Sequence, residues 1–159
     1  MKRFILSYFL FLGLLFGLFY APIWIVSDRL NEAQTHLTLF LLNLFLEPHQ
    51  LVDHIIHINP HYTIRIDKAC NGMIPILFLF GSIMAYPSKI KPKIIWMSVG
   101  YVMYNIVNVG RILLVVFITQ NGKGHADFYW SHDLIGNILL MGSGLLFFIG
   151  FIKRGSKMC

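Results

Sequence analysis

Three residues of the chain carry side chains suited to acyl transfer: Cys70, Arg111 and His132. A thiolate can attack a carbonyl carbon, an imidazole can carry the proton, and a guanidinium can stabilise the oxyanion that develops. Arginine suits the last role because it stays charged even where water is scarce. Each residue, taken singly, also has an ordinary structural explanation. Their placement therefore decides whether they can form one site.

Cys70 comes just before an apolar segment, residues 72–86, that we expect to be helical. The start of a helix offers unpaired backbone N–H groups and the positive end of the helix dipole, and both favour a reactive thiolate. The alternative is an inert, buried thiol, which is the commoner state of a single cysteine. The other cysteine, Cys159, falls on the opposite side of the membrane in the topology below. We therefore expect no disulfide between the two.

Arg111 lies within a long apolar segment, residues 94–119. A charge near the middle of a membrane span costs at least ~2.5–3.5 kcal/mol, so it needs a partner or a function. Tyr101, Tyr104, Asn108 and Arg111 are spaced 3, 4 and 3 apart, which places them along one helix face. That face must meet other helices or water. The alternative is a helix-packing seam with an arginine that reaches towards the surface.

His132 occupies the equivalent place before the last apolar segment, and Ser131 is the expected N-cap of that helix. Gly136 follows four residues later, on the same helix face, where a missing side chain lets another helix come close. The alternative for His132 is an interfacial histidine that binds headgroups or water. The loop before it also contains His125, which could compete for the same role.

The composition predicts an integral membrane protein. The chain is 57% hydrophobic and only 13% charged, whereas an ordinary soluble domain has about 25% charged residues. At 159 residues it has room for a single domain. The net charge of +6 comes largely from clusters that flank apolar segments, which points to membrane orientation and not to a nucleic-acid partner.

The hydropathy pattern predicts an all-α fold, a polytopic transmembrane helical bundle in one domain (1–159). Four spans are expected, at residues 4–26, 72–86, 94–119 and 134–152. The first is longer than the core of a signal peptide, so we expect an uncleaved anchor helix. Segment 37–46 has about half the length that a span requires, which favours an interfacial or re-entrant half-helix.

Residues 27–71 form the external segment in this topology. Within it, HYTIRID at 61–67 alternates apolar and polar side chains, which predicts a short strand leading to Cys70. A cytoplasmic N-terminus then places all seven acidic residues and all seven histidines outside. The cations on the inner side are Lys2, Arg3, Lys89, Lys91, Lys93, Lys153, Arg154 and Lys157. The positive-inside rule thus favours cytoplasmic termini and a site near the outer face.

Three short motifs resemble those of the exosortase/archaeosortase family. The chain has ACNG at 69–72, NVGR at 108–111 and HDLIG at 132–136. These resemble the Cys, Asn-x-x-Arg and His-x-x-x-Gly motifs of that family in order and in membrane placement, over roughly residues 35–150. The chain is similar to a short, core-only member.

The resemblance implies a membrane-embedded cysteine protease or transpeptidase in the cytoplasmic membrane of a bacterium or archaeon. Its partners would be exported proteins with a C-terminal sorting signal, made of a short motif, a hydrophobic span and a basic tail. By similarity, Cys70 would form a thioester, Arg111 would stabilise the transition state, and His132 would act as general acid and base. Asn108 would orient Arg111. The resemblance implies no cofactor and no metal.

Two other functions remain open from the sequence. His54, His57 and His61 are spaced so that a helix would align them, with His49 and Asp53 nearby, and such a cluster could bind zinc or copper. Asn59-Pro60 argues against that helix. The chain could also be a non-catalytic membrane subunit or a small transporter whose Asn/Arg face lines a pathway or a docking surface.

Overall fold

A computed structural model describes residues 2–21, 25–59, 62–68, 70–121 and 136–155. Most of them are helical, and three short strands lie between the second and third helices. The elements in chain order are α1 (Lys2–Phe19), α2 (Ile25–Asn43), β1 (Leu51–Val52), β2 (Ile55–Asn59), β3 (Tyr62–Arg65), α3 (Met73–Ala85), α4 (Ile90–Asn121), α6 (Gly136–Gly150) and a π-helical turn, η2 (Phe151–Gly155).

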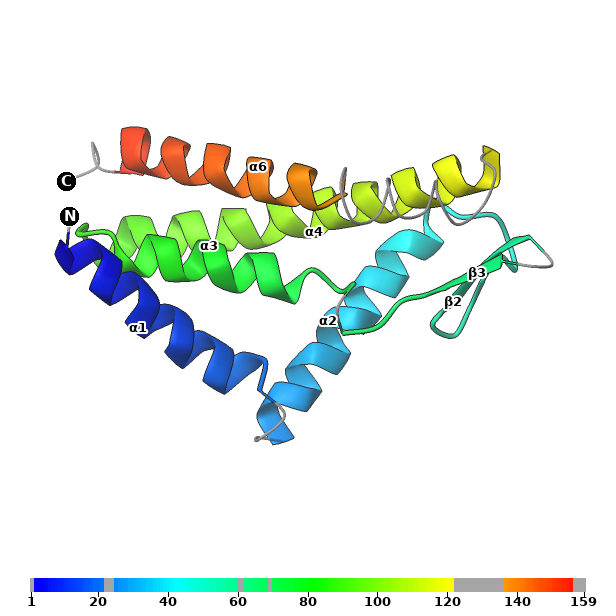
Figure 1. Cartoon of the computed structure of the whole chain (residues 1–159), viewed down its shortest axis with the longest axis horizontal. Helices are drawn as coiled ribbons and strands as arrows, with labels where there is room; N and C mark the ends of the chain where they lie inside the picture. The colour runs from blue at the N-terminus through cyan, green and yellow to red at the C-terminus, as the bar shows by residue number, and fades with distance from the viewer. Residues whose placement is uncertain (1, 22–24, 60–61, 69, 122–135, 156–159) are drawn as a thin grey trace.

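Helices α3, α4 and α6 lie side by side and form the body of the molecule (Figure 1). Helix α1 packs against α3, and α2 crosses from the end of α1 to α4. The strands lie near the last turns of α4, whereas the start of α1 and the end of α6 lie at the opposite end of the bundle (Figure 1). The connection from the strands to α3 therefore enters the bundle from the end that carries the sheet.

Within the described residues, three helices are long and apolar enough to cross a membrane: Lys2–Phe19, Ile90–Gln120 and Gly136–Arg154. The predicted helical membrane bundle is confirmed at this level. Helix α3 is apolar but has only 13 residues, or about 20 Å of length, against a hydrocarbon core of about 30 Å. The count of four spans stays a prediction, because α3 is short for a full crossing.

Helix α1 is shorter than the expected first span, residues 4–26. Helix α1 ends at Phe19, and the backbone N–H groups of Tyr20 and Ala21 both donate to the carbonyl oxygen of Phe16, at 3.0 and 2.8 Å. Pro22 follows in the sequence, and the residue before a proline is disfavoured in helical conformation. The apolar run thus continues past the point where the helix stops.

The expected half-helix at 37–46 is wrong in its bounds. Helix α2 is 19 residues long and starts at Ile25, so the apolar residues 37–43 are only its last part. The hydropathy pattern does not predict the first half of α2, because the side chains that this half buries are polar. The buried polar side chains of α2 lie along one helix face and are Ser27, Asn31, Gln34, Thr35 and Thr38. Their helical spacing is the signal that average hydropathy hides.

A small sheet corrects the expectation of an all-α fold. The three strands are antiparallel in the order β1-β2-β3, and the predicted strand before Cys70 is confirmed as β3. Ile56 of β2 pairs with Ile64 of β3, and both are buried. Because β2 carries His57 and begins just after His54, the helical alignment of histidines considered from the sequence is wrong.

Two apolar clusters hold the described parts together, and α4 contributes to both. The first joins α2, the sheet and the late turns of α4, through residues such as Leu42, Ile56 and Val115. The second joins α3, the early turns of α4, α6 and η2, and includes Ile83 and Phe151. The polar groups of the candidate site lie where these two clusters meet.

The length of α4 fixes the level of this junction. The helix has 32 residues, so it is about 48 Å long and exceeds the roughly 30 Å of a bilayer core. Asn108 lies about 27 Å along the axis from Ile90, at 1.5 Å per residue. The turns beyond Asn108 pack against the sheet through Val109, Ile112, Val115 and Val116. Asn108 thus sits about one core thickness from the start of the helix.

Candidate active site

Cys70 lies in a tight turn between β3 and α3. Its backbone N–H donates to the carbonyl oxygen of Asp67 at 3.0 Å, and its side chain is half-buried. Oδ1 of Asn71 accepts the backbone N–H of Met73, the first residue of α3, at 2.9 Å. Gly72 follows with φ 80°, in the left-handed region that favours glycine. The thiol is therefore carried by a turn of defined shape just before a helix, close to the expected placement.

Asn108 connects this turn to α4. Its Nδ2 donates to the carbonyl oxygen of Cys70 at 2.9 Å, across 38 residues of sequence. The side chain is 1% exposed, and its Oδ1 accepts no hydrogen bond from the described residues. The backbone of Gly72 leaves room for the contact, since a Cβ there would lie 3.0 Å from Cγ of Asn108. Asn108 was expected to orient Arg111; the observed bond is to the cysteine.

Arg111 follows Asn108 by one helical turn and is 5% exposed. It lines a cavity of about 500 Å³ between α3, α4 and α6, whose other walls are mainly apolar. The α3 wall includes Ile74 and Pro75, and the α6 wall includes Leu140. A guanidinium in such surroundings exerts a stronger field on a nearby charge than it would in water.

The polar face of α4 meets other helices, as expected. Tyr104 is 3% exposed, and its hydroxyl donates to the carbonyl oxygen of Leu140 on α6 at 3.3 Å. Tyr101 turns to the other side and donates to Oε1 of Gln34 on α2 at 2.7 Å. The face thus contacts α6 on one flank and α2 on the other, with Asn108 holding the turn before α3.

His132 lies outside the described residues, and so does His125. The chain is described again from Gly136, which is buried at the first position of α6. The next residue, Asn137, lines the same cavity as Arg111. Asn108 thus joins the Cys70 turn to α4, and Arg111, one turn further along α4, shares a cavity with Asn137 of α6.

A comparison with protein families decides the identity. Residues 5–149 of the chain match the model of the family described as transmembrane exosortase. The chain belongs to the transmembrane exosortase family. The match covers most of the chain and confirms the resemblance that the three motifs indicated. No curated protein and no solved structure matches this exosortase.

The sequence motifs of this exosortase include Asn71 but miss two residues that surround the cysteine turn, Gln34 and Asn105. Asn71 is fully buried, and Gln34 and Asn105 are 4% and 6% exposed. Gln34 Nε2 donates both to the carbonyl oxygen of Asn71 at 3.0 Å and to Oδ1 of Asn105 at 2.8 Å. Asn105 lies three residues before Asn108, so the periodicity of α4 could have revealed it. Gln34 could have been found only by treating residues 27–36 as helical.

The histidines beside the sheet do not form a metal centre in the described residues. No group of three or more His, Cys, Asp or Glu side chains within the ranges that the structure covers could hold a metal ion. The rings of His36 and His54 lie 6.0 Å apart, centroid to centroid, near the surface. His61 falls outside the described residues.

Replacing Gly72 by alanine is expected to disturb the cysteine turn. A side chain there would occupy a left-handed conformation, at a cost of roughly 1–2 kcal/mol, and would press on Asn108, 3.0 Å from its Cγ. We expect lower thermal stability in detergent and weaker activity of the folded protein. Gly110→Ala is the matched control, because a Cβ at that position of α4 meets nothing within 4 Å. Equal stability and activity of the two variants would contradict the proposed shape of the turn.

Proposed function

We propose that this exosortase family member is a cysteine transpeptidase that cleaves C-terminal sorting signals of exported proteins through a thioester on Cys70. The observation that carries the proposal is the 2.9 Å hydrogen bond from Asn108 to the Cys70 carbonyl oxygen. It ties the turn that holds a thiol to the helix that holds a buried arginine, one turn away. In this proposal the bond keeps the thiol and the cation in a fixed relation.

In the first step, the Cys70 thiolate attacks the carbonyl carbon of the scissile peptide bond. A tetrahedral intermediate forms, and its oxygen carries the negative charge. The C–N bond then breaks, and His132, acting as general acid, gives a proton to the leaving nitrogen. The products are a thioester between Cys70 and the exported protein, and a free C-terminal segment.

Arg111 stabilises the oxyanion in this scheme. It is 5% exposed and faces a mainly apolar cavity, so little water competes with the developing charge. A cation that is already in place when charge develops lowers the barrier without reorganising solvent. Arginine is preferred over lysine because it keeps its proton and offers a fork of N–H donors.

In the second step, an acceptor attacks the thioester carbonyl. His132, now acting as base, takes the proton of the acceptor amine, hydroxyl or water, and the Cys70–carbonyl bond breaks to regenerate the Cys70 thiolate. An amine or hydroxyl gives a transfer product, whereas water gives hydrolysis. In either case the exported protein is released with its original C-terminal segment removed.

The cavity beside Arg111 suits the hydrophobic span of a sorting signal. It continues along mainly apolar faces of α3 and α6 as far as Ser82 and Phe148. A substrate that is cleaved next to a hydrophobic span must place that span within the bilayer while its scissile bond stays at the thiol. We infer that the outer end of the span lies against this wall.

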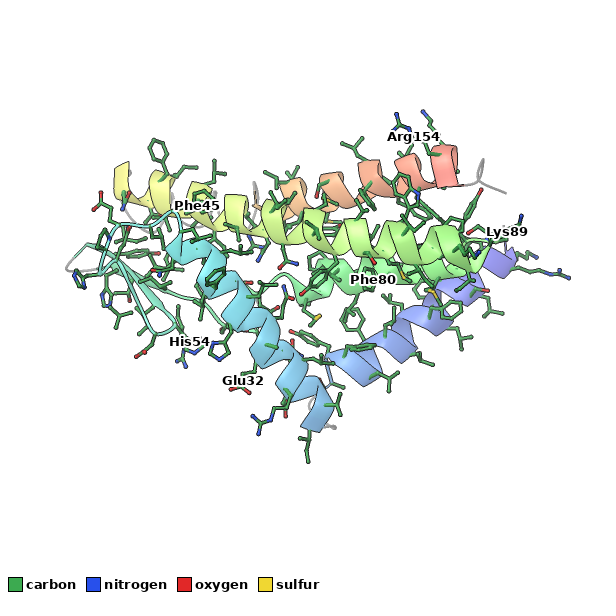
Figure 2. All side chains as sticks on the ribbon, turned by 180° about the vertical axis from the view of Figure 1, so that it is seen from behind. Glu32, Phe45, His54, Phe80, Lys89 and Arg154 are labelled. Carbon is green, nitrogen blue, oxygen red and sulfur yellow. The ribbon has the colours of Figure 1, made fainter. Side chains whose placement is uncertain are left out.

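The orientation follows from charge in this proposal. Lys89 and Arg154 lie at the end of the bundle away from the sheet (Figure 2), and the positive-inside rule assigns that end to the cytoplasm. Applied to intact cells, an impermeant maleimide should therefore label Cys70 faster than Cys159. Faster labelling of Cys159 would reverse the orientation.

A reporter protein tests the function directly. It carries an export signal, a candidate C-terminal motif, a hydrophobic span and a basic tail, and is expressed with or without this exosortase. We expect cleavage only in its presence and only when all three parts of the signal are intact. A stably inserted enzyme that cleaves no reporter from a panel of motifs would favour a non-catalytic membrane subunit or transporter.

A further inference from the structure

Gln34 of α2 links three parts of the chain that are distant in sequence. Its Nε2 donates to the carbonyl oxygen of Asn71, in the cysteine turn, at 3.0 Å and to Oδ1 of Asn105 on α4 at 2.8 Å. Its Oε1 accepts the hydroxyl of Tyr101, also on α4, at 2.7 Å. Both donor hydrogens and one acceptor site of the amide are therefore used, within a side chain that is 4% exposed.

Asn71, like Gln34, makes several buried hydrogen bonds. Its carbonyl oxygen also accepts the hydroxyl of Thr38 at 3.3 Å, and its Nδ2 donates to Oγ1 of Thr35 at 3.2 Å. Its Oδ1 accepts the N–H of Met73, as described above. The side chain is 0% exposed. Every polar atom of the Asn71 side chain and its carbonyl oxygen thus has a partner.

The bonds converge on two consecutive carbonyl groups next to the thiol. The carbonyl oxygen of Cys70 is bound by Asn108, and that of Asn71 by Gln34. Gln34 is in turn fixed by Asn105, which lies three residues before Asn108 and six before Arg111 on α4. The helix that carries the cation therefore sets the position of both carbonyls, once directly and once through α2.

We propose that Gln34 is a positioning residue of this site: it fixes the turn of Cys70 against the helix of Arg111. This inference rests on the proposed function for its catalytic consequence, although its effect on the thiol can be measured separately. Gln34 touches no reacting atom and acts through Asn71 and Asn105.

The chemistry of the network suits this role. Its members among the described residues are all uncharged: Asn31, Gln34, Thr35, Thr38, Asn71, Tyr101, Asn105 and Asn108. The network therefore holds the turn by hydrogen bonds between neutral groups. Because the groups are buried, breaking one bond leaves a partner without water to replace it, so the arrangement is stiff.

A role in helix packing alone would have different consequences. Polar side chains often join helices in membranes, and Gln34 does join α2 to α4 through Tyr101 and Asn105. Loss of such a link lowers the amount of folded protein but leaves each folded molecule with a normal thiol. Loss of a positioning bond changes the thiol and the turnover of the molecules that do fold.

The test uses the full-length protein with Cys159→Ser, so that Cys70 is the remaining thiol. Gln34→Met keeps the length and the unbranched shape of the side chain and removes the amide. Thr119→Val is the matched control, because the hydroxyl of Thr119 is buried in α4 but donates only to Val115, at 2.7 Å. Both variants delete a buried polar group; only the first touches the cysteine turn.

We expect Gln34→Met to lower kcat for the reporter peptide by about 10- to 100-fold, the scale of a small misplacement of reacting groups, with KM little changed. Cys70 should react several-fold faster with iodoacetamide, because a loosened turn exposes its half-buried thiol. Thr119→Val should match the parent in both measurements at similar thermal stability. A Gln34→Met variant that behaves like Thr119→Val in turnover and alkylation would overturn the proposal.

Tyr101→Phe covers the case in which Gln34→Met does not fold. It removes only the hydroxyl that donates to Gln34, on a half-buried side chain. The same changes in kcat and alkylation are expected at smaller size, and their absence would again overturn the proposal. If the parent protein cleaves no reporter, the proposed function fails, while faster alkylation of Cys70 in Gln34→Met would still support the positioning role and an unchanged rate would refute it.

Discussion

Replacing Cys70 by serine is expected to reduce processing of the reporter by about 10³-fold or more, with the protein still inserted and folded. The substitution exchanges one atom in a half-buried side chain, so the hydrogen bonds of the turn through its backbone remain possible. A serine hydroxyl is not ionised near neutral pH and needs a dedicated base to act as a nucleophile. The measurement is the rate of reporter cleavage, normalised to the amount of folded protein.

Cys159→Ser is the matched control for this variant, because it removes the other cysteine of the chain. We expect it to cleave the reporter at the parental rate. Near-normal cleavage by the Cys70→Ser protein would show that the thiol is not the nucleophile. The thioester mechanism would then have to be abandoned, whatever the family of the chain.

Replacing Arg111 by lysine is expected to impair turnover far more than stability. Lysine keeps a positive charge in the buried position, but as a compact ammonium without the planar fork of donors. If Arg111 stabilises the oxyanion, kcat should fall on the order of 100-fold, the scale seen when one donor to an oxyanion is removed. The thermal stability of the purified protein should change little, because charge and length are largely kept. The two quantities to compare are kcat and the midpoint of thermal unfolding.

Arg29→Lys provides the control for the same chemical change at the surface. Arg29 forms an exposed pair with Glu32 at 3.5 Å, one turn away on α2, and such pairs contribute little to stability. Its replacement should leave both turnover and unfolding unaltered. Normal turnover of Arg111→Lys would reduce Arg111 to a structural residue of the helix seam.

Much of the helical architecture could be predicted from hydropathy, because long apolar segments are stable in a bilayer and unfavourable in water. The polar seam of α4 was visible too, since its spacing of three and four residues follows the helix period. The spacing could not predict which other helix or turn each polar residue of α4 contacts. That Asn108 orients Arg111 stays a prediction, whereas its observed hydrogen bond is to the backbone of Cys70 and depends on where the turn before α3 lies.

Helix α2 was the main failure, and its cause is physical. Its buried face is polar because it packs against the polar turn of Cys70, so burial and hydropathy point in opposite directions there. A prediction that equates buried with apolar starts the helix only at residue 37, although Gln34 and Thr35 before it are buried in α2. The sheet was only half foreseen, because the pairing of Ile56 with Ile64 depends on their common packing against α4.

Mass spectrometry of the acid-quenched enzyme during turnover tests the central claim most directly. Purified protein is mixed with a reporter peptide and stopped within the first turnover, and the peptides that contain Cys70 are analysed. The account predicts an adduct on Cys70 with the mass of the acyl part of the reporter, sensitive to hydroxylamine and absent from Cys70→Ser. Cleaved reporter that accumulates with no acyl group ever found on Cys70 would contradict it.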